Sequence, residues 1–145
     1  MNRVLTSLVL VTALAGCNAL PRDAAGTTER IAREGAMRVA VLPGTHDASP
    51  ALSLLGNHAR RHDAQLAIVN LSGEHALRRL EDGELDAVVG HFAKTSPWMA
   101  NISLSKPVGQ AEPVDSRQPI LRIARRNGEN ALILATDRAV AQSAK

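Results

Sequence analysis

The chain has 145 residues, of which 45% are hydrophobic and 21% charged, and its formal net charge at pH 7 is +3. This length is enough for one domain with its own hydrophobic core and too short for two. The small charge, without arginines interleaved with aromatic residues, argues against a nucleic-acid-binding protein. A single cysteine excludes an internal disulfide, so the burial of apolar surface must stabilise the domain.

The first 16 residues have the pattern of an export signal. A short positive start precedes an apolar run from Val4 to Leu14, which is too short to span a bilayer. The following "LAGC" (14–17) resembles the lipobox of bacterial lipoproteins, in which the cysteine thiol receives a diacylglycerol and the signal is cleaved before the cysteine. We therefore expect a signal peptide over 1–16 and attachment to the lipid bilayer through Cys17. Asn18, in place of Asp, resembles the Gram-negative sorting signal for the outer membrane, which predicts a periplasmic protein anchored there.

The segment 17–28 is predicted to be a lipidated tether. Its residues are small and polar and include both Pro and Gly, a composition typical of linkers. The rest of the chain, 29–145, would then form the one folded domain.

The first half of that domain alternates between strand and helix patterns. Apolar runs rich in β-branched residues predict strands, and Ser49 with Pro50 supplies an N-cap and a first-turn proline. A second, shorter helix would end at Gly83. The predicted order is strand 37–42, a helix from 49, strand 64–71, helix 74–83 and strand 84–92.

This alternation predicts a three-layer α/β domain with a mainly parallel sheet and right-handed crossovers. Ligands of such sheets gather beyond the carboxyl ends of the strands, here 43–47, 70–73 and 91–98. The last of these segments holds the only Phe and the only Trp of the chain, Phe92 and Trp98. Both aromatic residues therefore follow a strand on the side where a site is expected.

The second half of the domain is predicted to return to the same sheet. Its expected elements are a helical turn from Ser96-Pro97, an extended segment over 102–108, a polar loop over 109–118, a strand over 119–126, an Asn127-Gly128 turn and a helix over 129–142.

Five sequence motifs follow one another along the predicted domain. They are "RIAREGAMRVAVLPG" (30–44), "LDAVVG" (85–90), a Thr-Pro-like turn, "ISLSKPV" (102–108) and "PILRIARRNGENALILATDRAVAQ" (119–142). Together they resemble family 3 of the bacterial extracellular solute-binding proteins, which have the type 2 periplasmic binding protein fold. The resemblance covers most of 29–142. It implies a protein that binds a small solute for a transporter.

The first departure from that family concerns its second lobe. In the family, the chain runs from the "FS.PY" stretch into a whole second lobe before it returns through the closing strand. Here only 11 residues separate Pro107 from Pro119. We therefore expect one lobe, which cannot bury a ligand by hinge closure.

The second departure concerns ligand recognition. Amino-acid receptors of the family use an Arg seven residues before the Ser of the "FS" stretch to bind the α-carboxylate of the ligand. Seven residues before Ser105 stands Trp98, and an indole cannot form that bidentate contact. The resemblance therefore does not imply amino-acid specificity.

Seven residues are candidates for contact with a ligand or partner. In the family, ligand faces the segment matching 94–98 and the loop after the first strand, and an indole suits a half-wet contact site. The alternative for Phe92 is a place in the core, and the alternative for Asp47 is the N-cap of the next helix. The candidates are Phe92, Lys94, Thr95, Ser96, Trp98, His46 and Asp47.

We predict no metal site, no cofactor and no catalytic residue. His58 and His62 are spaced to share a helix face, but a metal site needs further ligands, and Arg60 and Arg61 lie between them. No nucleophile elbow or carboxylate pair indicates an enzyme, and a single lobe cannot close over a dry site.

Two functions remain open. The protein would either hold a small solute for a transporter, or serve as a non-catalytic accessory subunit that docks on a membrane transporter, channel or sensor. An exposed apolar patch, where the second lobe is missing, would favour docking. We favour solute binding because of the resemblance.

Overall fold

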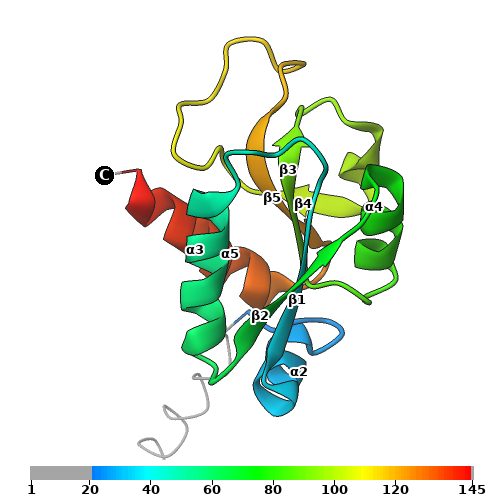
Figure 1. Cartoon of the computed structure of the whole chain (residues 1–145), viewed down its shortest axis with the longest axis vertical. Coiled ribbons are helices and arrows are strands. Elements are labelled where there is room, and N and C mark those ends of the chain that lie inside the picture. Colours follow the sequence, from blue (N-terminus) through cyan, green and yellow to red (C-terminus); the bar gives the residue numbers. More distant parts are fainter. Residues whose placement is uncertain (1–20, 145) are drawn as a thin grey trace, which may run out of the picture.

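The computed structural model describes residues 21–144, in which helices pack on both faces of one five-stranded sheet (Figure 1). The predicted signal peptide, Cys17 and Asn18 lie outside the described residues. Along the chain the elements are α2 (Thr27–Glu34), β1 (Ala36–Val41), α3 (Ser49–Arg60), β2 (Gln65–Asn70), α4 (Gly73–Glu81), β3 (Ala87–Phe92), the 3₁₀ helix η2 (Pro97–Ala100), β4 (Ile102–Leu104), β5 (Ile120–Arg126) and α5 (Asn130–Ser143).

The sheet has the strand order β2-β1-β3-β5-β4. β1 lies between β2 and β3 and is parallel to both, whereas β5 is antiparallel to β3 and to β4. Only β5 therefore runs against the other four strands. The predicted α/β class with a mainly parallel sheet is confirmed.

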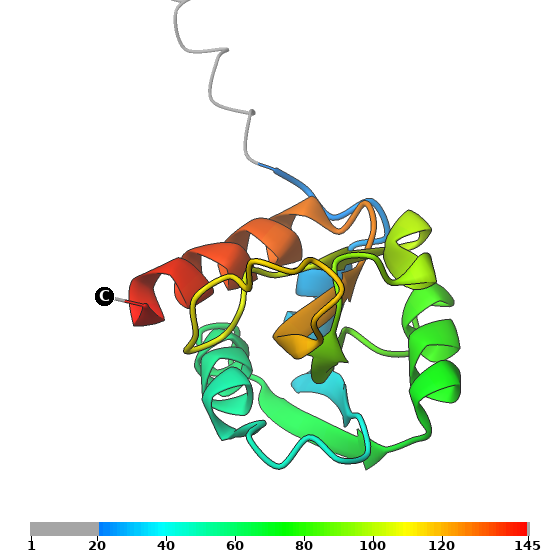
Figure 2. The same ribbon diagram turned by 90° about the horizontal axis from the view of Figure 1, so that it is seen from above.

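Helices cover both faces of the sheet (Figure 2), and two apolar clusters form the core between the helices and the sheet. On one face, α2, α3 and α5 pack over Val39 and Val89. On the other face, α4 and η2 pack over Val88 and Phe92. Neighbouring residues of β3 thus belong to opposite clusters, as the alternation of side chains along a strand requires.

Two element boundaries differ by more than two residues from those predicted. The third strand begins at Ala87 rather than at 84, because Gly83 has a positive φ of 77° and turns the chain after α4. The extended segment predicted over 102–108 is a strand only for Ile102–Leu104. Beyond it, Ser105 and Val108 still donate backbone hydrogen bonds to Ile123 and Leu121 of β5, and Pro107 has no N–H to donate.

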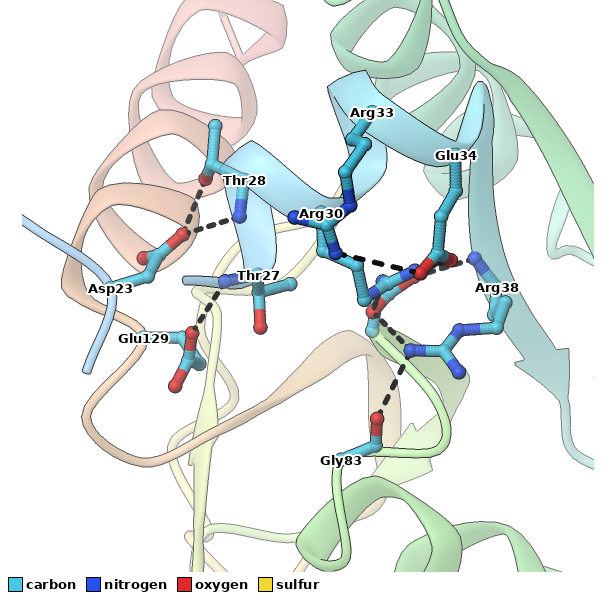
Figure 3. A network of polar contacts seen from close by, with 10 residues as sticks. Asp23, Thr27, Thr28, Arg30, Arg33, Glu34, Arg38, Gly83 and Glu129 are labelled. Atoms are coloured by element: carbon cyan, nitrogen blue, oxygen red, sulfur yellow. Dashed lines mark hydrogen bonds and ion pairs between the residues drawn. The ribbon is translucent and has the colours of Figure 1, made fainter. Parts of the chain in front are cut away.

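The folded domain begins before residue 29, where the tether was predicted to end. Asp23 accepts hydrogen bonds from the backbone N–H of Thr28 (2.8 Å) and of Leu132 (3.0 Å). Glu129, only 1% exposed, accepts from the backbone N–H of Ala25 (3.0 Å) and Thr27 (3.2 Å). These two carboxylates join the segment before α2 to the start of α5 (Figure 3).

A second polar group fixes the other side of α2. The buried carboxylate of Asp86 accepts a hydrogen bond from Arg30 on α2 and another, of 2.7 Å, from the backbone N–H of Arg38 on β1. Arg38 also donates to the carbonyl of Gly83, 3.1 Å away (Figure 3). α2 therefore belongs to the folded domain, although its first two residues lie in the segment that was predicted to be a tether.

A loop of residues 105–119, which we call the joining loop, connects β4 to β5. It stands where the family that the sequence resembles inserts a second lobe. Pro107 and Val108 are buried, and the buried guanidinium of Arg122 donates to the carbonyl of Ser105 (2.8 Å) and to the carboxylate of Glu112. The loop therefore folds back on β5 and covers part of the sheet's end. The single-lobe architecture agrees with the sequence prediction.

Among the helices of residues 21–144, none has the length and apolar character needed to cross a membrane.

Candidate functional site

A pocket of about 450 Å³ lies at the carboxyl ends of β1 and β2, and we call it the strand-end pocket. Its walls come from two loops, one after each strand. The lining residues are Val41, Leu42, Pro43, Gly44, Thr45, His46, Asn70, Leu71 and Ser72. This is the edge of the sheet where the parallel strands predict a site, and its volume suits a small molecule.

The floor of the pocket depends on a glycine in β3. Leu42 continues the pairing of β1 with β3, since its N–H donates to the carbonyl of Val89 (2.9 Å). The Leu42 side chain then lies across Gly90, where an added Cβ would come within 2.6 Å of Leu42 Cδ1. Only glycine leaves room for Leu42 in this position.

The polar side chains around the pocket belong to Thr, Ser, Asn and His residues. Thr45 and Ser72 contribute hydroxyls, Asn70 an amide and His46 an imidazole ring. Ser72 is the N-cap of α4, but its side chain makes no capping hydrogen bond. Since no Lys, Arg, Asp or Glu lines the pocket, it is suited to a polar solute without a strong net charge.

A contact between two polar side chains, His91 and Asp47, joins the loop after β1 to β3. His91 Nε2, at the end of β3, lies 3.0 Å from Asp47 Oδ1, and both side chains are partly exposed. Asp47 was considered as the N-cap of α3, but the N-cap is Ala48, and no side chain caps that helix. Asp47 instead ties the 43–47 loop to the neighbouring strand, and His46 stays exposed beside the pocket.

Lys94 is part of a second polar group. Its Nζ lies 3.3 Å from Glu112 Oε1, and Glu112 is also bonded to Arg122. The hydrogen bond from Arg122, followed by that from Lys94, holds the pKa of Glu112 below its usual value. Lys94 therefore attaches the segment after β3 to the joining loop, and its ammonium group forms an ion pair with Glu112.

The two aromatic residues have different environments. Phe92 is 5% exposed and packs in the cluster beneath α4, so its side chain belongs to the core rather than to the surface. Trp98, on η2, is half-buried and packs against the same cluster. Thr95 is exposed and Ser96 half-buried, and none of these four residues lines the strand-end pocket. Trp98, Thr95 and Ser96 remain predicted contacts, at the edge of the sheet but outside the pocket.

Several residues of the site were not among the sequence candidates. Asn70, Leu71 and Ser72 belong to a strand end that the sequence analysis marked, but no single residue there carried a signal. His91 had no predicted partner, because its pairing with Asp47 depends on β1 and β3 being neighbours. Knowledge of the strand order would have been needed to find that pair.

A larger hollow, of about 670 Å³, lies at the amino end of β2 and includes Arg60, Asp63 and Gln65. Ligands of parallel sheets bind at the carboxyl ends of the strands, so we base the candidate site on the strand-end pocket. Within residues 21–144, no three His, Cys, Asp or Glu side chains are grouped so that they could hold a metal ion.

No protein-family model and no curated protein sequence matches the chain. Solved structures do show similar folds. The arginine-bound form of domain 1 from TmArgBP, of T. maritima, superposes with a TM-score of 0.61 at 16% identity, over 78% of this chain and 97% of that one. An ancestral cationic amino acid solute-binding protein gives a TM-score of 0.63 at 11% identity, over 80% and 93% of the two chains.

The L-cystine solute receptor of Neisseria gonorrhoeae, in its unliganded open conformation, is similar with a TM-score of 0.55 and 12% identity, over 79% of this chain and 89% of that one. At these identities the likeness concerns the fold alone. The chain has the fold of a single solute-binding-protein lobe.

Proposed function

We propose that this protein is a single-lobed binding protein that holds a small, uncharged polar solute in the strand-end pocket and works with a membrane transporter. The observation that carries the proposal is the pocket itself. It lies at the carboxyl ends of two parallel strands, in a fold whose structural neighbours are solute-binding domains.

A single lobe is sufficient for binding in at least one neighbour. The structure from TmArgBP is described as the arginine-bound form of domain 1, and nearly all of that chain superposes on this one. By analogy, the strand-end pocket can hold a solute without a second lobe. One side of that solute would stay in contact with water, so we expect modest affinity.

The chemistry of the pocket argues against amino acids as ligands. Trp98 stands where amino-acid receptors of the family that the sequence resembles have the Arg for the α-carboxylate. No Lys or Arg lines the strand-end pocket. Hydroxyl and amide groups above an apolar floor of Leu42 and Leu71 suit a neutral solute with several hydrogen-bonding groups.

The tether and the partner belong to the same proposal. Lipidation at Cys17 would keep the domain at the periplasmic face of the outer membrane of a Gram-negative bacterium, where a transporter could collect the solute. The alternative function, docking without a solute, needs a contiguous apolar surface. The large exposed apolar side chains of residues 21–144 are instead distributed over three elements: Ile68 on β2, Met99 on η2 and Val114 in the joining loop.

A thermal-shift screen of neutral polar solutes tests the proposal. A solute that binds with micromolar affinity, present at about a thousandfold excess, should raise the free energy of unfolding by roughly 4 kcal/mol, which corresponds to a rise in melting temperature of about ten degrees or more. Free amino acids at millimolar concentrations should give no shift.

The matched pair Asn70→Ala and Gln65→Ala localises any effect. Both residues are exposed amides on β2, one at the pocket and one at the opposite end of the strand. The proposal requires that Asn70→Ala reduce the shift and Gln65→Ala preserve it. Equal shifts in both variants would place binding elsewhere.

A further inference from the structure

A second pocket, distinct from the strand-end pocket, lies between α3 and α5, and we call it the α3–α5 pocket. Its volume is about 400 Å³, and its walls include His58 in the last turn of α3, Arg61 and His62 just after α3, and Ala135, Arg138 and Gln142 from α5. α3 begins after the carboxyl end of β1 and ends just before the amino end of β2. The two pockets therefore lie at opposite ends of the sheet.

The charges of this pocket are unbalanced. No carboxylate lines it, and neither Arg61 nor Arg138 has an ion-pair partner within residues 21–144. Most other arginines in that part of the chain do have one. They are Arg30, Arg33, Arg38, Arg78, Arg79, Arg117, Arg122 and Arg125. Two guanidiniums thus share one hollow without a counterion from the protein.

A buried imidazole stands beside them. His58 is 3% exposed, and its Nε2 has no hydrogen-bond partner among the described residues. Its ring centroid lies 4.8 Å from that of His62. Burial, with the charges of His62 and Arg61 against a smaller opposite effect of Asp23, lowers the pKa of His58 to about 4. The ring is therefore neutral at pH 7, and the positive charge comes from the two arginines.

The donors come from two separate walls. Ala135, Arg138 and Gln142 are spaced by three and four residues, so they share the face of α5 that borders the pocket. Arg61 and His62 border it from the segment just after α3. Donors on two walls can each reach oxygens on different sides of a tetrahedral anion, and a guanidinium fork matches phosphate geometry.

We propose that the α3–α5 pocket binds the phosphate group of a small solute, held between Arg61 and Arg138 with His62 and Gln142 as further donors. The volume of the pocket is in the range of small-molecule sites. The site is independent of the strand-end pocket, so neither proposal depends on the other.

Titration with inorganic phosphate, followed by NMR of the histidine ring protons, tests this proposal on the purified full-length protein. Sodium chloride at matched ionic strength serves as the reference. We expect saturable shifts of the His58 and His62 signals. His62 and Arg61 lower the pKa of His58, and Asp23 raises it. A bound anion would offset the positive charge of Arg61 and Arg138, so phosphate should raise the pKa of His58.

Arg61→Gln and Arg138→Gln should each weaken phosphate binding by about tenfold, since each removes a charge-assisted hydrogen bond. Both arginines are exposed, so the variants should keep the melting temperature of the parent. Arg60→Gln is the matched control, because Arg60 carries the same charge one residue away and donates to Asn57 instead. Asn70→Ala should bind phosphate as the parent does.

Three results would overturn the proposal. The first is the absence of saturable shifts up to tens of millimolar phosphate, and the second is an equal loss of binding in Arg60→Gln, which would indicate only a general charge effect. The third is binding to vesicles that contain phosphatidic acid without any response to soluble phosphate, which would assign the arginines to a membrane surface.

Discussion

Trp98 shows how one side chain can serve packing and contact together. It is half-buried, packs against the cluster beneath α4 and lies at the edge of the sheet where a ligand or partner could approach. From the sequence, Trp98 was expected to contact a ligand or partner. The structure gives it a packing role for its buried part and leaves the remainder accessible.

Trp98→Ala should therefore lower the free energy of unfolding by about 2 kcal/mol, which is less than the loss for a fully buried Trp. Urea unfolding of the parent and the variant, without added solute, measures the difference. Thr95→Ala, an exposed neighbour, serves as the control and should change the stability little. A Trp98→Ala variant as stable as the parent would show that the indole does not pack on the core.

His58 makes the stability depend on pH. Its pKa is lowered from 6.5 to about 4 in the folded protein, chiefly by burial, so the unfolded chain binds this proton more readily. The stability that neutral His58 contributes is complete above pH 6.5 and is lost as the pH falls toward 4, by about 3 kcal/mol in total.

His58→Leu should remove this part of the pH dependence. Unfolding free energies at pH 7 and pH 4 should differ by about 3 kcal/mol less in the variant than in the parent, because Leu does not titrate. His75→Leu provides a control, since His75 is exposed on α4. The same pH dependence in His58→Leu and the parent would mean that folding does not lower the pKa of His58, because the folded and unfolded states would then bind this proton equally.

At the scale of elements, the local sequence pattern predicted the helices and strands better than it predicted the contacts between them. Pro50, in the first turn, marked the start of α3, whereas Ser49 is not its N-cap. The alternation of strand and helix patterns predicted the mainly parallel sheet. The Asp47–His91 pair and the Lys94–Glu112–Arg122 group could not be predicted, because each joins segments that meet only through the strand order or the folded joining loop. The tether boundary was misplaced for the same reason, since Glu129 lies far along the chain from the segment that it holds.

Glu129→Ala tests that attachment of the first segment to α5. The change leaves the backbone N–H groups of Ala25 and Thr27 without their acceptors, so the stability should fall by about 3 kcal/mol. Amide hydrogen exchange over 23–28 should also become faster. Glu81→Ala, at the exposed end of α4, is the control. Unchanged exchange over 23–28 in Glu129→Ala would contradict the attachment.

At the scale of the whole molecule, the protein is one lobe closed by the joining loop on one side of the sheet and open at the strand-end pocket. A lipid on Cys17 would anchor this lobe at the membrane surface. The lipidation site follows from the sequence pattern alone, so it needs its own test.

Cys17→Ser should release the protein into the soluble periplasmic fraction or leave it unprocessed, because stable attachment depends on the acyl chains. Fractionation of cells that express the parent or the variant, with immunodetection, measures the outcome. Asn18→Asp should keep lipidation while moving the protein from the outer to the inner membrane. Membrane fractionation that is the same for Cys17→Ser and the parent would rule out the anchor.

Amide chemical shifts, recorded with and without the solute that stabilises the protein most, locate the bound solute on the structure. If the strand-end pocket holds the solute, the perturbed amides should cluster in 42–46 and 70–72, with little change at Asp63 and Gln65 at the other end of β2. Perturbations that leave 42–46 and 70–72 unchanged would contradict binding in that pocket.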